Sequence, residues 1–217
     1  MSSVFEQFEH FGVVPVLEIE QAVQAAELAH ALAAGGLPIA EVTLRTPAAL
    51  ESIRQIAQHA PNVLLGAGTI LTLEQARAAC DAGARFLVSP GFVHEVVEWS
   101  LGAGIPCLPG AVTPTEITWG VNLGLSVLKF FPAGALGGVQ LIEAMADPFG
   151  GLRFVTTGGI RPENMSAYLH SKRILAVGGS WMATRAMISA GQFTRIEELT
   201  RQSAEIVRSI RKSQGRD

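Results

Sequence analysis

The chain has 217 residues, of which 48% are hydrophobic and 16% charged, with a formal net charge of −3. This composition can bury a sizeable core, and no basic stripe points to nucleic-acid binding. Two cysteines are too few for a disulfide framework. No signal peptide is visible at the start, and the weakly charged region 100–128 contains too many Gly, Pro, Asn and Thr residues for a membrane span. We therefore expect a soluble cytoplasmic protein with neither a nucleic-acid nor a membrane partner.

Strand-like and helix-like segments alternate from one end of the sequence to the other. Strands are predicted at 12–19, 39–44, 63–70, 86–90, 106–111, 126–132, 153–158 and 174–179. Helices are predicted at 21–34, 47–60, 72–82, 93–101, 114–123, 138–146 and 162–170. A long amphipathic segment, 183–212, closes the chain, and residues 2–11 suit a short helix before the first strand.

Eight strand–helix units in a row predict an α/β fold with a parallel sheet. Because no linker interrupts them, we expect one closed (β/α)8 TIM barrel spanning 1–217 as a single domain. The alternative is a doubly wound open sheet, which usually has a glycine-rich turn after its first strand. Here the first strand ends Leu17-Glu18-Ile19-Glu20, which disfavours that alternative.

Lys129 stands out because Val127, Leu128, Phe130 and Phe131 surround it in an apolar strand. Lysine is rarely buried unless it is paired or functional. Burial favours the neutral amine, which is a nucleophile toward carbonyls and forms Schiff bases. The plainer interpretation is a lysine at a strand end whose ammonium reaches solvent or a carboxylate.

The second predicted strand places Glu41, Thr43 and Arg45 on one side, because side chains alternate along a strand. Active sites of such barrels lie at the carboxyl ends of the strands. The pattern therefore favours a carboxylate and a guanidinium that face a substrate. An internal Glu41–Arg45 ion pair is the structural alternative.

Small residues end several other strands. Thr69 follows two glycines of the third strand, and Pro90 lies in a turn after the fourth. Glycine pairs end the seventh and eighth strands, where barrel enzymes commonly bind phosphate through backbone N–H groups and helix N-termini. These residues could equally be ordinary turn residues. The candidate phosphate residues are Thr157, Gly158, Gly159, Gly179 and Ser180.

Taken together, these segments resemble the 2-keto-3-deoxy-6-phosphogluconate (KDPG) and 4-hydroxy-2-oxoglutarate (KHG) aldolases over nearly the whole chain. The matching stretches are 41–45, 66–69, 89–91, 128–133, 157–160 and 178–181. The resemblance implies a class I aldolase of the Entner–Doudoroff pathway, a carbon–carbon lyase that needs no metal or other cofactor and forms a homotrimer.

The resemblance also implies residue roles. Lys129 would form the Schiff base and Glu41 would transfer protons. Arg45 and Thr69 would hold the pyruvate carboxylate, and Pro90 and Phe131 would line the pyruvate pocket. The sugar phosphate would bind at Thr157, Gly158, Gly159 and Ser180.

Two segments depart from the family pattern. The family often has Pro where this chain has Thr156, and Glu-Ala-Asn-Gly-Gly where it has residues 134–138.

Two other functions compete with the aldolase. One is a different barrel enzyme, such as an isomerase or a phosphate-ester synthase, in which Lys129 acts only electrostatically. The other is a catalytically silent barrel that binds a phosphorylated metabolite.

Overall fold

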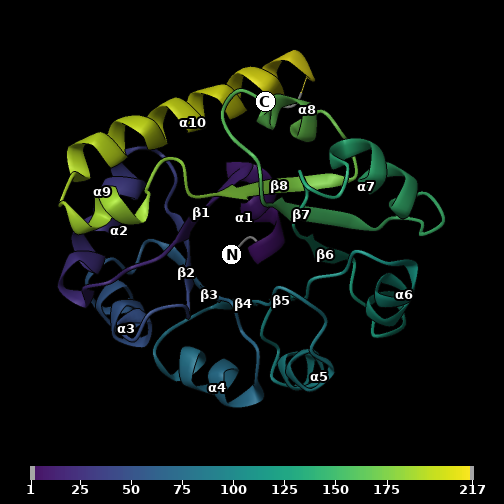
Figure 1. Cartoon of the computed structure of the whole chain (residues 1–217), viewed down its shortest axis with the longest axis horizontal. Helices are drawn as coiled ribbons and strands as arrows, with labels where there is room; N and C mark the ends of the chain where they lie inside the picture. The colour runs from purple at the N-terminus through teal and green to yellow at the C-terminus, as the bar shows by residue number, and fades with distance from the viewer. Residues whose placement is uncertain (1–2, 216–217) are drawn as a thin grey trace.

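The computed structural model describes residues 3–215, which form a nearly closed parallel barrel surrounded by helices (Figure 1). The eight strands are β1 Val13–Leu17, β2 Ile39–Thr43, β3 Leu64–Gly68, β4 Phe86–Val88, β5 Cys107–Leu108, β6 Val127–Phe130, β7 Arg153–Thr157 and β8 Ile174–Gly179. Their order is β5-β4-β3-β2-β1-β8-β7-β6, and every adjacent pair is parallel. The predicted barrel is confirmed, and the doubly wound alternative is wrong.

The two end strands of this order, β5 and β6, meet through Lys129. Its backbone N–H donates to the carbonyl of Pro109 at 2.9 Å, and its carbonyl accepts from the N–H of Ala111 at 2.9 Å. A parallel bridge between Gly110 and Lys129 accompanies these bonds. The strand that carries the candidate nucleophile therefore also completes the circle.

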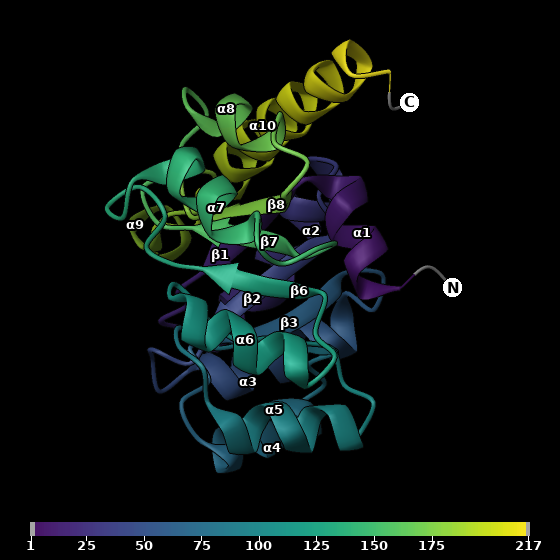
Figure 2. The same ribbon diagram turned by 90° about the vertical axis from the view of Figure 1, so that its right-hand side faces the viewer.

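Helix α1, Val4–Phe11, precedes the first strand as predicted. The Ser3 hydroxyl accepts from the Glu6 N–H, and the Glu6 carboxylate accepts from the Ser3 N–H, which is a capping box. Phe8 is buried against Phe86 with ring centroids 4.9 Å apart. Figure 2 shows α1 at the side of the barrel opposite the tip of the β6 arrow, so it covers the amino ends of the strands.

The remaining helices connect consecutive strands or follow the last one. They are α2 Ala25–Ala34, α3 Ala49–His59, α4 Leu73–Asp81, α5 His94–Gly102, α6 Pro114–Asn122, α7 Gly138–Ala146, α8 Met165–Leu169, α9 Arg185–Ser189 and α10 Phe193–Ser213. A 3₁₀ turn, η1 Ala22–Gln24, leads into α2. Within residues 3–215, no helix combines the length and apolar character needed to cross a membrane.

The C-terminal segment differs from its prediction as one long element. Gly191 adopts the left-handed region at φ +64° and separates α9 from α10. The N–H of Gln192 bonds back to the carbonyl of Met187 at 3.0 Å, which closes α9 in the manner of a glycine cap. The amphipathic pattern continues through the break, so periodicity alone does not reveal it.

The pleat of β6 decides which of its side chains face the helices. Phe130 packs edge-on against Phe154 with ring centroids 5.7 Å apart, and Leu128 lies under Gly120 of α6. Because side chains alternate along a strand, Lys129 points the opposite way, into the barrel.

Candidate active site

Lys129 of β6 and Glu41 of β2 meet inside the barrel. The distance between Lys129 Nζ and Glu41 Oε1 is 3.6 Å, and the two side chains are 7% and 4% exposed. Glu41 Oε1 has no hydrogen-bond partner within the described part of the chain. A buried ion pair whose carboxylate oxygen lacks a hydrogen bond lowers the folding stability of the protein, and such pairs are typical of functional sites.

Gly68 of β3 makes room for this carboxylate. A Cβ atom at this position would lie 2.0 Å from Glu41 Oε1, so any side chain would displace the carboxylate. Glycine is therefore required at the end of β3, because the Glu41 carboxylate occupies the space that a side chain would fill.

A cavity of about 190 Å³ opens above the pair, at the carboxyl ends of the strands. Phe131 forms one wall, with its ring centroid 5.5 Å from Lys129 Nζ. The residues that line the cavity are Val16, Arg45, Thr69, Pro90, Lys129, Phe131, Thr157, Gly158, Gly159, Ile160, Gly178, Gly179 and Ser180. All the predicted site residues except Glu41 are in this set, and Glu41 lies beneath it against Lys129.

Arg45 projects from the loop after β2, which ends at Thr43. Its Nε donates to Thr69 Oγ1 at 3.2 Å. Thr69 has φ +60° and is the one non-glycine residue between 3 and 215 with positive φ. For a β-branched residue this conformation is strained, and such strain concentrates at functional sites. The hydroxyl and the guanidinium thus form one unit at the rim of the cavity.

The structure does not contain the alternative Glu41–Arg45 ion pair, because each of the two residues pairs with another side chain. Glu41 pairs with Lys129, whereas Arg45 Nη1 lies 3.7 Å from Glu18 Oε2. Thr43, predicted to share their face, instead donates its hydroxyl to the carbonyl of Leu17 at 2.8 Å and is fully buried.

Glu18 and Arg185 were not identified from the sequence. Arg185 Nη1 lies 2.9 Å from Glu18 Oε1, and its Nη2 lies 2.5 Å from Glu20 Oε1. The carboxylates follow β1 and the arginine begins α9, so the contact joins segments 167 residues apart. The sequence signal for this contact is the pair of glutamates that follows the first strand, which by itself does not indicate a partner.

The glycine pairs serve different purposes. Gly158 and Gly159 have φ of +94° and +78°, so these positions favour glycine for their backbone conformation. A Cβ at Gly179 would lie 1.8 Å from the Trp181 ring, whose Nε1 donates to Ser203 at 2.9 Å. Gly179 therefore lines the cavity but is also fixed by packing, whereas the Ser180 side chain can be changed independently.

The two departures from the family pattern lie in different places. Thr156 pairs in register with Phe130 on the face toward the helices, and its buried hydroxyl lacks a hydrogen-bond partner among residues 3–215. Gly134 lies behind the cavity wall, where its N–H donates to the carbonyl of the lining residue Gly158 at 2.9 Å. The second departure therefore contacts the wall of the cavity, whereas Thr156 faces away from it.

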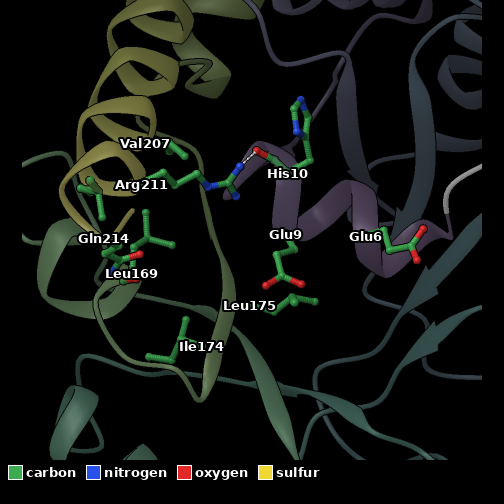
Figure 3. Close-up of a pocket in the computed structure, with 10 residues that line it drawn as sticks. Glu6, Glu9, His10, Leu169, Ile174, Leu175, Val207, Arg211 and Gln214 are labelled. Carbon is green, nitrogen blue, oxygen red and sulfur yellow. Dashed lines mark hydrogen bonds between the residues drawn. The ribbon is translucent and has the colours of Figure 1, made fainter. Parts of the chain in front are cut away.

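A larger cavity of about 320 Å³ lies at the amino-end side of the barrel, between α1, α8 and α10 (Figure 3). Its polar groups already have protein partners. Glu9 pairs with Arg153 at 2.8 Å, Arg211 donates to the carbonyl of His10, and Gln214 donates to that of Leu169 at 3.2 Å. The smaller cavity is the better candidate because it holds the lysine and lies at the end where barrel enzymes place their chemistry.

A (β/α)8 barrel with a buried lysine beside a carboxylate has the arrangement of enzymes that act on carbonyl compounds through a Schiff base. The sequence profile described as KDPG and KHG aldolase matches residues 4–199. This chain belongs to that family of carbon–carbon lyases.

Individual relatives agree with this assignment. The 2-dehydro-3-deoxy-phosphogluconate aldolase of Treponema pallidum is 47% identical over 207 residues, covering 95% of this chain and 99% of the relative. The KHG/KDPG aldolase of Escherichia coli K12 is 42% identical over 193 residues, covering 89% of this chain and 91% of the relative. A Legionella pneumophila KDPG aldolase, solved with pyruvate as a covalent carbinolamine intermediate, superposes with TM-score 0.88 at 36% identity, covering 92% of this chain and 97% of that one.

Proposed function

We propose that the protein is a class I aldolase that cleaves 2-keto-3-deoxy-6-phosphogluconate to pyruvate and glyceraldehyde 3-phosphate. The observation that carries the proposal is the buried Lys129–Glu41 pair, 3.6 Å apart, beneath a cavity at the carboxyl ends of the strands. The names of the relatives support the choice of substrate, and one of them adds KHG as a second substrate.

The reaction begins when Glu41 takes a proton from Lys129, whose amine then attacks the C2 ketone to give a carbinolamine. Glu41 gives the proton to the carbinolamine hydroxyl, which leaves as water to form a protonated imine and restores the carboxylate. Glu41, directly or through water, removes the proton from the C4 hydroxyl. The C3–C4 bond then breaks, its electron pair moves into the imine to give an enamine, and glyceraldehyde 3-phosphate leaves. Glu41 returns a proton to C3, and water hydrolyses the pyruvyl imine to free Lys129. Since the imine is the electron sink, we propose that no metal or other cofactor takes part.

The rim of the cavity provides for the two ends of the substrate. Arg45 and Thr69 would bind the carboxylate, because a guanidinium can donate two parallel hydrogen bonds to it. Pro90 and Phe131 would flank the pyruvyl carbons. At the opposite wall, backbone N–H groups near Gly158 and Gly159 and the Ser180 hydroxyl would bind the phosphate.

Two other functions explain less of the geometry. A barrel enzyme that used Lys129 only for its charge would have no need to bury it beside a carboxylate, and neither would a silent binding protein. A cytoplasmic location fits the proposal because the multiply charged substrate crosses an apolar membrane at high cost.

We also propose that the chain forms a homotrimer through the outer face of α5 and α6. Leu101, Trp119 and Val121 are 43%, 41% and 41% exposed, which is high for large apolar side chains. The Trp119 ring lies beside the His94 ring of α5, with centroids 4.7 Å apart and the ring planes tilted by 60°, so aromatic contacts join the two helices at this surface.

Pyruvate plus borohydride should add one reduced pyruvyl group per chain, on Lys129, as located by peptide mass spectrometry. Lys129→Met keeps a similar volume but has no amine, so it should give no adduct. The exposed Lys172, replaced by Met, is the matched control and should leave the adduct in place. An adduct on Lys172 or Lys212 instead of Lys129 would refute the proposed nucleophile.

Glu41→Gln should still form the imine but should exchange the methyl protons of pyruvate with deuterated water roughly 10²–10⁴-fold more slowly, the usual contribution of a general acid–base group. Proton NMR of the methyl signal measures this rate. Glu51→Gln on the surface of α3 is the control and should exchange at the wild-type rate. Wild-type exchange in Glu41→Gln would assign proton transfer to another group.

Ser180→Asp should raise the half-saturation for KDPG cleavage strongly, because a carboxylate next to the phosphate position repels it. Ser180→Ala removes one hydrogen bond without adding charge and should cost less, on the order of tenfold. A coupled assay for glyceraldehyde 3-phosphate measures both variants. Equal half-saturation in Ser180→Asp and the wild type would place the phosphate elsewhere.

The wild-type protein should sediment as an assembly of three chains of 22.9 kDa each. Trp119→Asp should sediment as a single chain, because it places a charge in the apolar contact. Val23→Asp is the control and should remain trimeric. Val23 is 83% exposed on η1, which leads directly into α2, and α2 lies across the barrel from α6 (Figure 1). A monomeric wild type would exclude the trimer, and a trimeric Trp119→Asp would exclude this interface.

A further inference from the structure

Four charged side chains form a chain along the rim of the candidate active site: Glu20, Arg185, Glu18 and Arg45. Arg185 begins α9, which lies at the carboxyl ends of the strands (Figure 2). The contacts are 2.5 Å between Glu20 and Arg185, 2.9 Å between Arg185 and Glu18, and 3.7 Å between Glu18 and Arg45. The formal charges of the four groups cancel.

The two contacts of Glu18 differ in kind. At 2.9 Å its Oε1 accepts a hydrogen bond from Arg185, whereas at 3.7 Å its Oε2 is beyond hydrogen-bond distance from Arg45. Glu18 is therefore bonded to Arg185 and only attracted to Arg45. Both carboxylate oxygens face a guanidinium, so a small movement would exchange one partner for the other.

The Nη N–H groups of Arg45, here called its Nη edge, can donate hydrogen bonds either to the Glu18 carboxylate or to a substrate carboxylate. Its Nε is already used by Thr69. A two-bonded grip on a carboxylate needs the remaining N–H groups. A Glu18 carboxylate that closed onto Nη1 would occupy part of this edge and would also repel the incoming anion. The two carboxylates compete for one guanidinium.

We propose that Arg185 is a positioning residue that restrains Glu18 and so keeps the Nη edge of Arg45 available to the keto-acid carboxylate. This inference rests on the proposed function, which assigns Arg45 to the substrate. Glu20 contributes by holding the other side of the Arg185 guanidinium. Without Arg185, Glu18 has one cation left in reach and closes onto Arg45.

The test measures the half-saturation of pyruvate in the borohydride trapping reaction, using the full-length protein. Arg185→Gln should raise it roughly three- to tenfold, a size appropriate to partly exposed charges. Glu18→Gln alone should leave it unchanged or lower it, because the competing carboxylate is gone. Adding Glu18→Gln to Arg185→Gln should restore the wild-type value. A merely structural role of Arg185 would not be rescued in this way.

Two further variants sharpen the test. Arg185→Lys retains a charge for Glu18 and should fall between the wild type and Arg185→Gln. Arg195→Gln is the matched control, because Arg195 forms an exposed pair with Glu198 at 3.0 Å on α10, and it should trap pyruvate as the wild type does. The effect of Arg185→Gln should shrink as salt is raised, because the charges are screened.

Three results would overturn the inference. These are a double variant as weak as Arg185→Gln, a raised half-saturation in Glu18→Gln alone, or an Arg185→Gln variant indistinguishable from the wild type. The Glu18→Gln result also decides the matter if Arg185→Gln fails to fold, as checked by thermal melting. If the wild type itself traps no pyruvate, the proposed function fails first and takes this inference with it.

Discussion

The barrel is organised around a buried ion pair between Lys129 and Glu41. The two residues come from β6 and β2, which lie four strands apart in the sheet and therefore face each other across the barrel. Removing two charges from water costs several kcal/mol per ion, and their mutual attraction offsets this only in part. The surrounding structure must therefore hold them together. The absent side chain at Gly68 leaves the space that the Glu41 carboxylate occupies beside Lys129. Loss of either partner would leave the other charge buried alone, so neither residue can be exchanged freely.

Most of the barrel could be predicted from the sequence because its elements obey local rules. Short apolar runs, each followed by an amphipathic segment and a glycine or proline, can pack only as alternating strands and helices. The α9–α10 break escaped prediction because Gly191 interrupts a pattern whose apolar periodicity continues on both sides. The hydroxyl of Thr156 turned out to face the helices, which sequence parity did not decide because its neighbour Thr157 is equally polar.

The candidate site was predictable where the polarity of one residue differs from that of its neighbours, as at Lys129, which lies in an apolar strand. It was not predictable where a contact joins distant segments. The partner of Arg45 is Glu18, and that of Glu18 is Arg185, and no spacing rule links these three positions. Alternation along β2 does not extend to Arg45, because the strand ends at Thr43 and Arg45 reaches the cavity from the loop beyond it. Gly179 lines the cavity as expected, yet its neighbour Trp181 explains the missing side chain equally well.

The closure of the barrel has a consequence for how the enzyme would lose activity. Strands β5 and β6 are joined where Lys129 bonds to Pro109 and Ala111, beside a β5 of only two residues. A short seam of this kind opens at lower free energy than the long pairs on the other side of the barrel. When it opens, β6 keeps its pairing with β7 but loses its support from β5, and the amine of Lys129 is free to move away from Glu41. Inactivation on heating would then precede global unfolding, and amide exchange at Lys129 would report the fraction of molecules in which the seam is open and the site is disrupted.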